Sequence, residues 1–152
     1  MANPMELAEH IRQTLVRSGD RLEGFAITAA VLFGSVARET QTKDSDADLL
    51  VVAEGLHARR NRRGARAAQI KSLFPKIPLD ILLLTREEVI SNFRNHNPLF
   101  LDIAVEGLIL LDPEDFLSGL MSETKNYIRT KGIRRFGDGW IFPVRKGVAV
   151  PL

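Results

Sequence analysis

Apolar and polar residues follow one another along this chain in blocks that predict strands separated by helices. Short runs rich in apolar and β-branched residues predict strands at 25–33, 46–53, 77–84 and 108–111. Apolar residues three or four positions apart predict amphipathic helices at 4–17, 56–74, 85–93, 98–106 and 113–131, and a short helix beginning at 35–38. Strands that alternate with helices predict one α/β domain.

Residues that favour helix ends mark several of these boundaries. Asn3 followed by Pro4 is typical of an N-cap and the first helical position. Thr85 with Glu88 three residues later predicts a capping box. Gly64 weakens the early part of the second helix, so we expect regular helix to begin near it.

Length and composition limit the class of protein. At 152 residues the chain fits one domain with a core of its own. It has no cysteine, which excludes disulfides and thiolate ligands, so any metal ion must be held by oxygen or imidazole groups. No apolar run is long enough to cross a membrane, and Glu6, Glu9 and Arg12 interrupt any signal-peptide pattern. We therefore expect a cytoplasmic protein that does not enter a membrane.

The C-terminal segment has a different sequence pattern from the rest of the chain, where helices and strands alternate. A Gly-Asp-Gly sequence between Phe136 and Trp140 predicts a tight turn that joins two short extended pieces. We therefore divide the chain into a domain at 1–132 and an extended tail at 133–152. The tail packs either on the domain or on a partner, since an exposed aromatic end often marks an interface.

Three carboxylates on strand-like segments are the main candidates for chemistry. Asp46 and Asp48 open the second predicted strand, and their side chains point to the same face because strand residues alternate. Asp80 is the single acid in the third predicted strand, where burial without a partner would cost several kcal/mol. If the third strand lies beside the second, the three acids form an oxygen-donor site that suits Mg²⁺ or Mn²⁺.

A glycine turn precedes these acids at the end of the first predicted strand. Gly34 allows close approach of the backbone, and the Ser35 hydroxyl and the N–H groups after it can bind phosphate oxygens. Arg38 follows one turn later and can add a charge-assisted contact. The turn and the acids therefore suit two parts of one ligand, a triphosphate and the metal ion that bridges it. Each feature alone is also compatible with a plain turn, a strand cap or a structural acid.

The stretch GSVAR…SDADLLVV, followed by the distant Asp80, resembles the nucleotidyltransferase superfamily of DNA polymerase β type. It is most similar to the minimal nucleotidyltransferases (MNT), some of which are antitoxins paired with an all-helical HEPN partner. The resemblance implies a small mixed β-sheet flanked by helices, a nucleoside triphosphate substrate and Mg²⁺.

The resemblance also implies a role for each matching residue. Asp46 and Asp48 would bind both metal ions, and Asp80 would complete the metal site nearer the acceptor and help to deprotonate its hydroxyl group. The residues that it assigns to the nucleotide and its phosphates are Gly34, Ser35, Arg38 and Ser45. One residue departs from the family pattern: Glu39 stands where glycine is common, which bears on the shape of the loop and on the charge near the triphosphate.

We therefore expect an enzyme that moves a nucleoside monophosphate, AMP from ATP in the first instance, to a hydroxyl group. A protein acceptor fits best, because so short a chain has no obvious second domain for a large acceptor. A HEPN-type partner is the candidate that the resemblance implies. Two alternatives stay open: transfer to a small molecule such as an aminoglycoside, with a homo-oligomer completing the pocket, and a non-catalytic antitoxin or binding module that keeps the fold.

The segment from Arg59 to Arg66 is strongly basic. Arg59, Arg63 and Arg66 have the spacing of one helix face, which is typical of a solvated face. The sharper alternative is a surface for RNA or for an acidic protein partner. No aromatic residue is interleaved with these arginines, so the segment is only a weak signal for nucleic acid, and binding to nucleic acid stays open.

Overall fold

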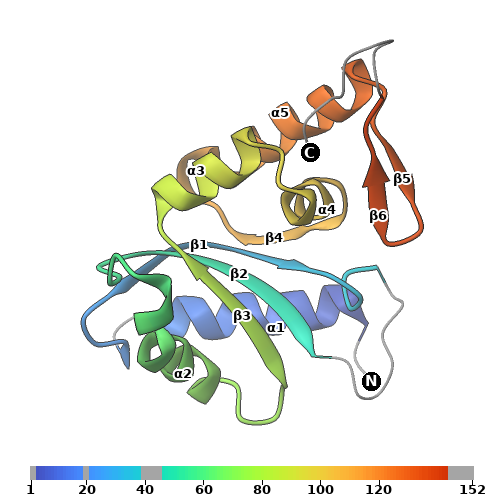
Figure 1. Cartoon of the computed structure of the whole chain (residues 1–152). Coiled ribbons are helices and arrows are strands. Elements are labelled where there is room, and N and C mark those ends of the chain that lie inside the picture. The colour runs from blue at the N-terminus through green and yellow to red at the C-terminus, as the bar shows by residue number, and fades with distance from the viewer. Residues whose placement is uncertain (1–2, 19–20, 39–45, 144–152) are drawn as a thin grey trace.

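A four-stranded mixed sheet forms the centre of the fold (Figure 1). The computed structural model describes residues 3–18, 21–38 and 46–143. The strands, in the spatial order β3-β2-β1-β4, are β1 (Ala26–Phe33), β2 (Ala47–Glu54), β3 (Leu79–Leu84) and β4 (Leu108–Leu111). Strand β1 is antiparallel to β2 and β4, whereas β2 and β3 are parallel. The predicted strands and the mixed sheet are therefore confirmed.

Both faces of the sheet are covered, which explains why its central strands are apolar at nearly every position. Alternate residues of β1 enter different parts of the core: Ala30 and Leu32 pack on one side, and Val31 and Phe33 on the other. Because successive side chains of a strand point in opposite directions, a strand buried on both sides has no polar face.

Helices cover the two faces of the sheet unequally (Figure 1). Helices α1 (Pro4–Arg17) and α2 (Gly64–Ser72) supply Ile11 and Ile70 to the core on one side. The helices on the other side are α3 (Arg86–Arg94), α4 (Pro98–Glu106) and α5 (Phe116–Thr130). The predicted fold class, a small sheet flanked by helices, is confirmed.

Local capping explains where these helices begin. The Asn3 side chain accepts a hydrogen bond of 2.9 Å from the Glu6 N–H, as expected of an N-cap. Thr85 and Glu88 form the predicted capping box at the start of α3. Helix α2 begins at Gly64, as predicted, and the residues before it form only a short 3₁₀ helix at Arg60–Arg62.

Two predicted helix starts differ from the structure. Residues 35–38 form a turn closed by a hydrogen bond of 3.1 Å from the Arg38 N–H to the Gly34 carbonyl, and the described residues of this segment contain no helix. A 3₁₀ helix, η3 (Pro113–Asp115), precedes α5, which starts at Phe116 instead of Pro113. The Asp112 carboxylate accepts hydrogen bonds from the first N–H groups of α5 and so caps it from a distance.

The chain after α5 forms a small hairpin beside α4 (Figure 1). Strands β5 (Arg134–Phe136) and β6 (Gly139–Ile141) pair in antiparallel fashion around the expected glycine turn. Ile133 and Phe142, at the two ends of the hairpin, pack with Leu101 of α4 in a separate apolar cluster. In the described residues, none of the helices is both long and apolar enough to span a membrane.

Candidate active site

The register of the sheet places two of the predicted acids side by side. Asp48 of β2 is the pairing partner of Asp80 of β3, and the two strands are parallel. Neighbouring strands lie about 4.8 Å apart, and paired residues project to the same face, so the two carboxylates are adjacent. Asp48 also pairs with Phe33, the last residue of β1, so the turn at Gly34 follows directly on the other side.

The three acids differ in exposure. Asp48 is half-buried, whereas Asp80 and Asp46 are exposed, Asp46 because it lies just before β2. The sequence argument assumed that Asp80 is buried, and this assumption is wrong, because β3 is an edge strand and Asp80 is exposed to solvent. What links Asp80 to the site is its pairing with Asp48.

Like charges crowd around Asp48. The pKa of Asp48 lies above the ordinary value of an aspartate, first because of burial and then because of the negative charges of Asp80 and Asp46. The positive charge of Arg38 opposes this shift. A site that raises the pKa of its own carboxylate in this way is stabilised by any cation that enters it.

The backbone conformation and the surroundings of position 34 both favour glycine. The φ of Gly34 is +80°, in the left-handed region that favours glycine. A Cβ built on Gly34 would overlap Oδ2 of Asp48. The absence of a side chain therefore brings the turn against the acid, and Ser35 follows it at the cavity wall.

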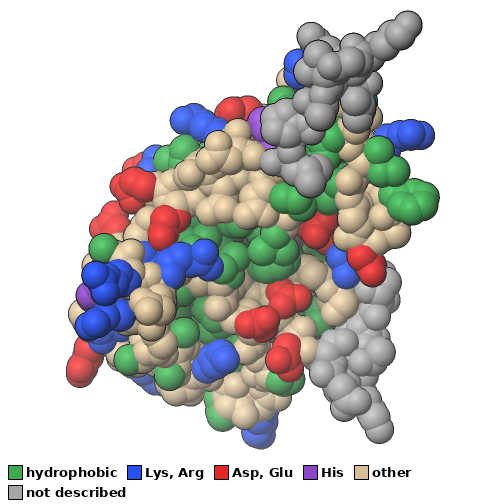
Figure 2. Space-filling view, in the orientation of Figure 1, with side chains coloured by type: hydrophobic (Ala, Val, Ile, Leu, Met, Phe, Trp, Pro, Cys, Tyr) green, Lys and Arg blue, Asp and Glu red, His purple; other side chains and the backbone are tan. Residues whose placement is uncertain are grey.

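A cavity of about 510 Å³ opens over these residues. Its walls bring together Gly34, Ser35, Arg38, Asp48, Asp80, Asp102 and Glu106, with apolar side chains between them. Figure 2 shows acidic side chains gathered over β2 and β3, next to a band of apolar surface. Of the other predicted site residues, Asp46 is described but does not line this cavity, and Ser45 and Glu39 lie outside the described residues.

A network of ion pairs lies at the wall of the cavity that also holds Asp48 and Asp80. Arg38 forms an ion pair of 2.8 Å with Glu106, which is only 12% exposed. Arg135 of the C-terminal hairpin lies 3.5 Å from Glu106 and 3.0 Å from Asp102. The indole N–H of Trp140 donates a hydrogen bond of 2.8 Å to Asp102, and the Arg135 guanidinium stacks on its ring. The hairpin is thus connected through Glu106 to Arg38, which the sequence predicts to bind phosphate.

The sequence interpretation missed Asp102 and Glu106. They stand four residues apart on α4, a helix that is otherwise almost entirely apolar. Residues four positions apart lie on the same face of a helix. Two acids on one face of an otherwise apolar helix are therefore the sequence signal that could have identified a polar site beside α4.

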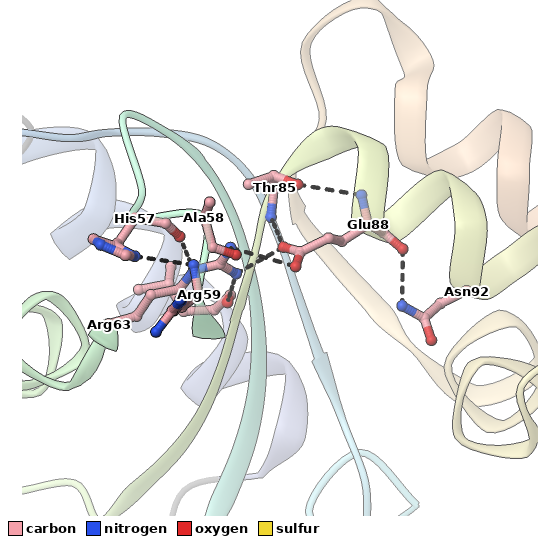
Figure 3. Close-up of polar contacts among 8 residues, drawn as sticks. His57, Ala58, Arg59, Arg63, Thr85, Glu88 and Asn92 are labelled. Carbon is pink, nitrogen blue, oxygen red and sulfur yellow. Dashed lines mark hydrogen bonds and ion pairs between the residues drawn. The ribbon is translucent and has the colours of Figure 1, made fainter. Parts of the chain in front are cut away.

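The spacing of the basic segment predicted that Arg63 lies on a solvated face, but this prediction is wrong. Arg63 is 4% exposed, and Figure 3 shows its guanidinium between the 57–58 backbone and Glu88. It donates to the carbonyl oxygens of His57 and Leu83 at 2.8 and 3.1 Å and to the Glu88 carboxylate at 2.7 Å. The short 3₁₀ helix turns Arg63 inward, while Arg59, Arg60 and Arg62 stay exposed.

Comparison with known proteins decides the family. The sequence model of the nucleotidyltransferase domain matches residues 13–111, a span that includes the glycine turn and the acids. The chain belongs to this family. The predicted class of enzyme, a nucleotidyltransferase, is confirmed, and this nucleotidyltransferase gave no match among curated proteins.

Several solved structures are similar to this nucleotidyltransferase at low identity. A toxin–antitoxin crystal structure with AMP-PNP is 20% identical, with a TM-score of 0.47, over 82% of this chain and 92% of the other. A tri-AMPylated Shewanella oneidensis HEPN toxin in complex with an MNT antitoxin gives 17% and 0.45, over 82% and 87%. The toxin–antitoxin MntA–HepT gives 18% and 0.42, over 84% and 92%.

Proposed function

We propose that this nucleotidyltransferase moves AMP from ATP to a hydroxyl group of a partner protein, with Mg²⁺ or Mn²⁺ as cofactor. The observation that carries the proposal is the pairing of Asp48 with Asp80 beside the turn at Gly34, at the wall of one cavity. A paired set of carboxylates next to a phosphate-binding turn suits a metal-bound triphosphate.

The donor set fits a hard divalent cation. Asp46, Asp48 and Asp80 offer only oxygen ligands. Burial and then the negative charges of Asp80 and Asp46 raise the pKa of Asp48, and a divalent cation would relieve the repulsion among these carboxylates. Among the described residues, no three acidic or histidine side chains already converge in a way that would hold a metal ion. We therefore expect these carboxylates to close around the ion only when it binds together with the nucleotide.

The remaining residues of the site would hold the phosphates. Gly34, Ser35 and Arg38 all line the cavity. We assign the binding of the β- and γ-phosphates to this turn. We also assign Ser45, which precedes the acids in the sequence, to the residues that bind the nucleotide and its phosphates.

The reaction follows from these positions. The acceptor oxygen attacks the α-phosphorus, the bond from that phosphorus to the β-phosphate oxygen breaks, and pyrophosphate leaves. The hydroxyl proton passes to the carboxylate of Asp80, which lies on the open edge of the sheet where an acceptor can approach. Divalent cations at such a site stabilise the charge on the attacking and leaving oxygens.

A protein acceptor is favoured by the size and openness of the site. The cavity is bounded by a single small domain, and Asp80 is exposed at an edge strand instead of lying in a deep pocket. The sequence GSVAR…SDADLLVV resembles the MNT antitoxins, so a HEPN-type protein is the first acceptor to test. Both ATP and Mg²⁺ are available in the cytoplasm, where we place the reaction.

The test is transfer of label from α-³²P-ATP to a HEPN partner in the presence of Mg²⁺. We expect labelling by the wild type and its loss in Asp48→Asn and Asp80→Asn, with Asp138→Asn on the exposed hairpin turn as a matched control. Equal labelling by the wild type and the two site variants would contradict the proposal. Thermal stabilisation by a non-hydrolysable ATP analogue without any transfer would instead favour a binding module.

A further inference from the structure

A second cavity adjoins the candidate active site along β3. It has a volume of about 410 Å³ and shares Ile81 and Leu82 with the first cavity. Beyond these two residues it is bounded by Arg60, Asn61 and the start of α2. We call the two adjoining cavities together the groove. It extends from Asp80, past the apolar side chains of Ile81 and Leu82 at the edge of β3, to Arg60 in the basic segment.

The outer edge of β3 is available along this groove. The Pro78 carbonyl accepts a hydrogen bond of 3.0 Å from the Ala47 N–H, so residue 78 and every second residue after it point their backbone groups toward β2. Ile81 and Leu83 therefore point theirs outward. The Leu83 carbonyl accepts from Arg63, whereas in the described structure no strand pairs with the outer side at Ile81.

The far end of the groove carries uncompensated positive charge. The guanidinium groups of Arg59, Arg60 and Arg62 are exposed and, within the described part of the chain, form no ion pair with an acid. Figure 2 shows a cluster of Lys and Arg side chains at the left of the face that carries the acids. The groove therefore has an acidic catalytic end and a basic end, separated by apolar surface.

We propose that this groove docks an extended, acidic segment of the partner protein by adding it as a strand to the outer edge of β3. The backbone of such a segment would pair with Ile81, its apolar side chains would cover the apolar part of the groove, and its acidic side chains would meet Arg60 and Arg62. The identity of this segment as the acceptor rests on the proposed function; the docking itself does not.

Spacing along the strand connects the docking to the chemistry. Asp80 and Leu83 are three residues apart, about 10 Å at the rise of a strand. A segment with acidic residues opposite Arg60 would therefore place a hydroxyl residue about three positions away next to Asp80. The groove thereby selects acceptors by the charge that flanks the hydroxyl residue.

Nucleic acid is a poorer fit to the same surface. Phosphates would also meet the arginines, but none of the residues that line the second cavity is aromatic, so bases have no stacking surface there. Only a polypeptide can form the regular hydrogen bonds that the outer edge of β3 offers.

The test is fluorescence anisotropy with two labelled ten-residue peptides, one alternating Glu with Val and containing one Tyr, the other with Lys in place of Glu. The wild type should bind the Glu peptide and not the Lys peptide. Arg60→Glu/Arg62→Glu should weaken binding about tenfold, and the effect should shrink at high salt. The matched control Lys125→Glu/Arg129→Glu, with the same charge change on the exposed face of α5, should bind as the wild type does.

A backbone variant tests the strand addition itself. Ile81→Pro removes the outward N–H without removing a bond to β2, a change that edge strands tolerate, and should weaken binding about tenfold. Ile81→Val keeps the N–H and should bind normally. Equal binding of both peptides by all proteins would overturn the proposal, as would preferred binding of a single-stranded RNA that is lost in the double arginine variant.

The outcome separates docking from catalysis. Asp48→Asn should lose nucleotide transfer and keep peptide binding. Peptide binding without transfer in the wild type would contradict the proposed reaction alone, whereas transfer with equal affinity for both peptides would overturn the docking alone.

Discussion

Gly34 and Asp48 lie so close together that a Cβ on Gly34 would overlap a carboxylate oxygen of Asp48. The contact joins the turn after β1 to Asp48 and, through it, to Asp80, its pairing partner on β3. The turn and the acids are therefore one structural unit, and a side chain at Gly34 would disturb both.

Gly34→Ala should abolish nucleotide transfer and lower the free energy of unfolding by about 1–3 kcal/mol. The new methyl group would push Asp48 aside, and the φ of +80° would be strained for alanine. Gly119→Ala is the matched control, since Gly119 lies in α5 with open space around it, and it should stabilise the protein by about 0.5–1 kcal/mol. Denaturant unfolding measures both, and equal effects of the two changes would contradict this reading of Gly34.

Asp80→Asn should raise the melting temperature in metal-free buffer near neutral pH while it removes transfer. Burial raises the pKa of Asp48 most, and the negative charge of Asp80 raises it further. Removing this charge should therefore stabilise the protein, but the exposure of Asp80 limits the gain to about 2 °C. Because the pKa of Asp48 is higher in the folded than in the unfolded state, its contribution to stability is fully present below the unfolded value, about 3.9, and is lost as pH rises through the raised folded value.

Calorimetry from pH 3.5 to 7 checks this relation. The melting temperature of Asp80→Asn relative to that of the wild type should increase with rising pH. This difference should disappear when Mg²⁺ and an ATP analogue are present, because the cation then relieves the repulsion in the wild type. Asp138→Asn, which removes an exposed acid from the hairpin turn, should show no such growth.

Arg63→Ala should lower the free energy of unfolding by about 2–4 kcal/mol. The change would leave the buried Leu83 carbonyl and the partly buried His57 carbonyl without their donor, and it would remove the ion pair to Glu88. Arg62→Ala, next to it in the sequence but exposed, should change stability by less than about 0.5 kcal/mol. Similar losses in the two variants would contradict a buried role for Arg63.

Glu88 should make the protein sensitive to acid. Burial acts to raise the pKa of Glu88, but the hydrogen bond from Arg63 and the capping contacts with Thr85 outweigh it, so the pKa lies below its ordinary value. The resulting stability is fully present above the unfolded pKa, about 4.3, and is lost as pH falls through the lowered folded value. Glu88→Gln should flatten this acid limb in urea titrations, whereas Glu87→Gln on the exposed side of α3 should preserve it.

Arg135→Ala should raise the KM for ATP severalfold with little change in kcat. Glu106 forms ion pairs with both Arg135 and Arg38. Without Arg135, Glu106 would bind Arg38 more strongly, and Arg38 would be less available to bind the phosphates of ATP. Glu106→Gln should have the opposite effect on KM, because it releases Arg38.

The neighbouring Arg134 provides the control for the charge of the hairpin. It is exposed, and Arg134→Ala should leave both constants unchanged. Trp140 is the single tryptophan, so its fluorescence reports whether the hairpin still packs in each variant. Unchanged KM values in Arg135→Ala with an intact fluorescence signal would exclude this coupling.

Much of the fold could be predicted because its signals are local. The apolar runs of β1 and β2, the capping box at Thr85 and the break at Gly64 each depend on residues within a few positions of one another. The helix predicted to begin at 35–38 is wrong, because a glycine before a short polar segment is compatible with a turn as well as with a helix start.

By itself the sequence determined the family, the glycine turn and which acids are candidates, since the order and spacing of residues are sufficient for these. The tertiary structure decided which residues meet. It paired Asp48 with Asp80 across two parallel strands, put Asp80 on an exposed edge, buried Arg63 against Glu88 and joined the C-terminal hairpin to Arg38 through Glu106. These contacts connect residues far apart in the chain, so their distances depend on how whole elements pack, which no local pattern specifies.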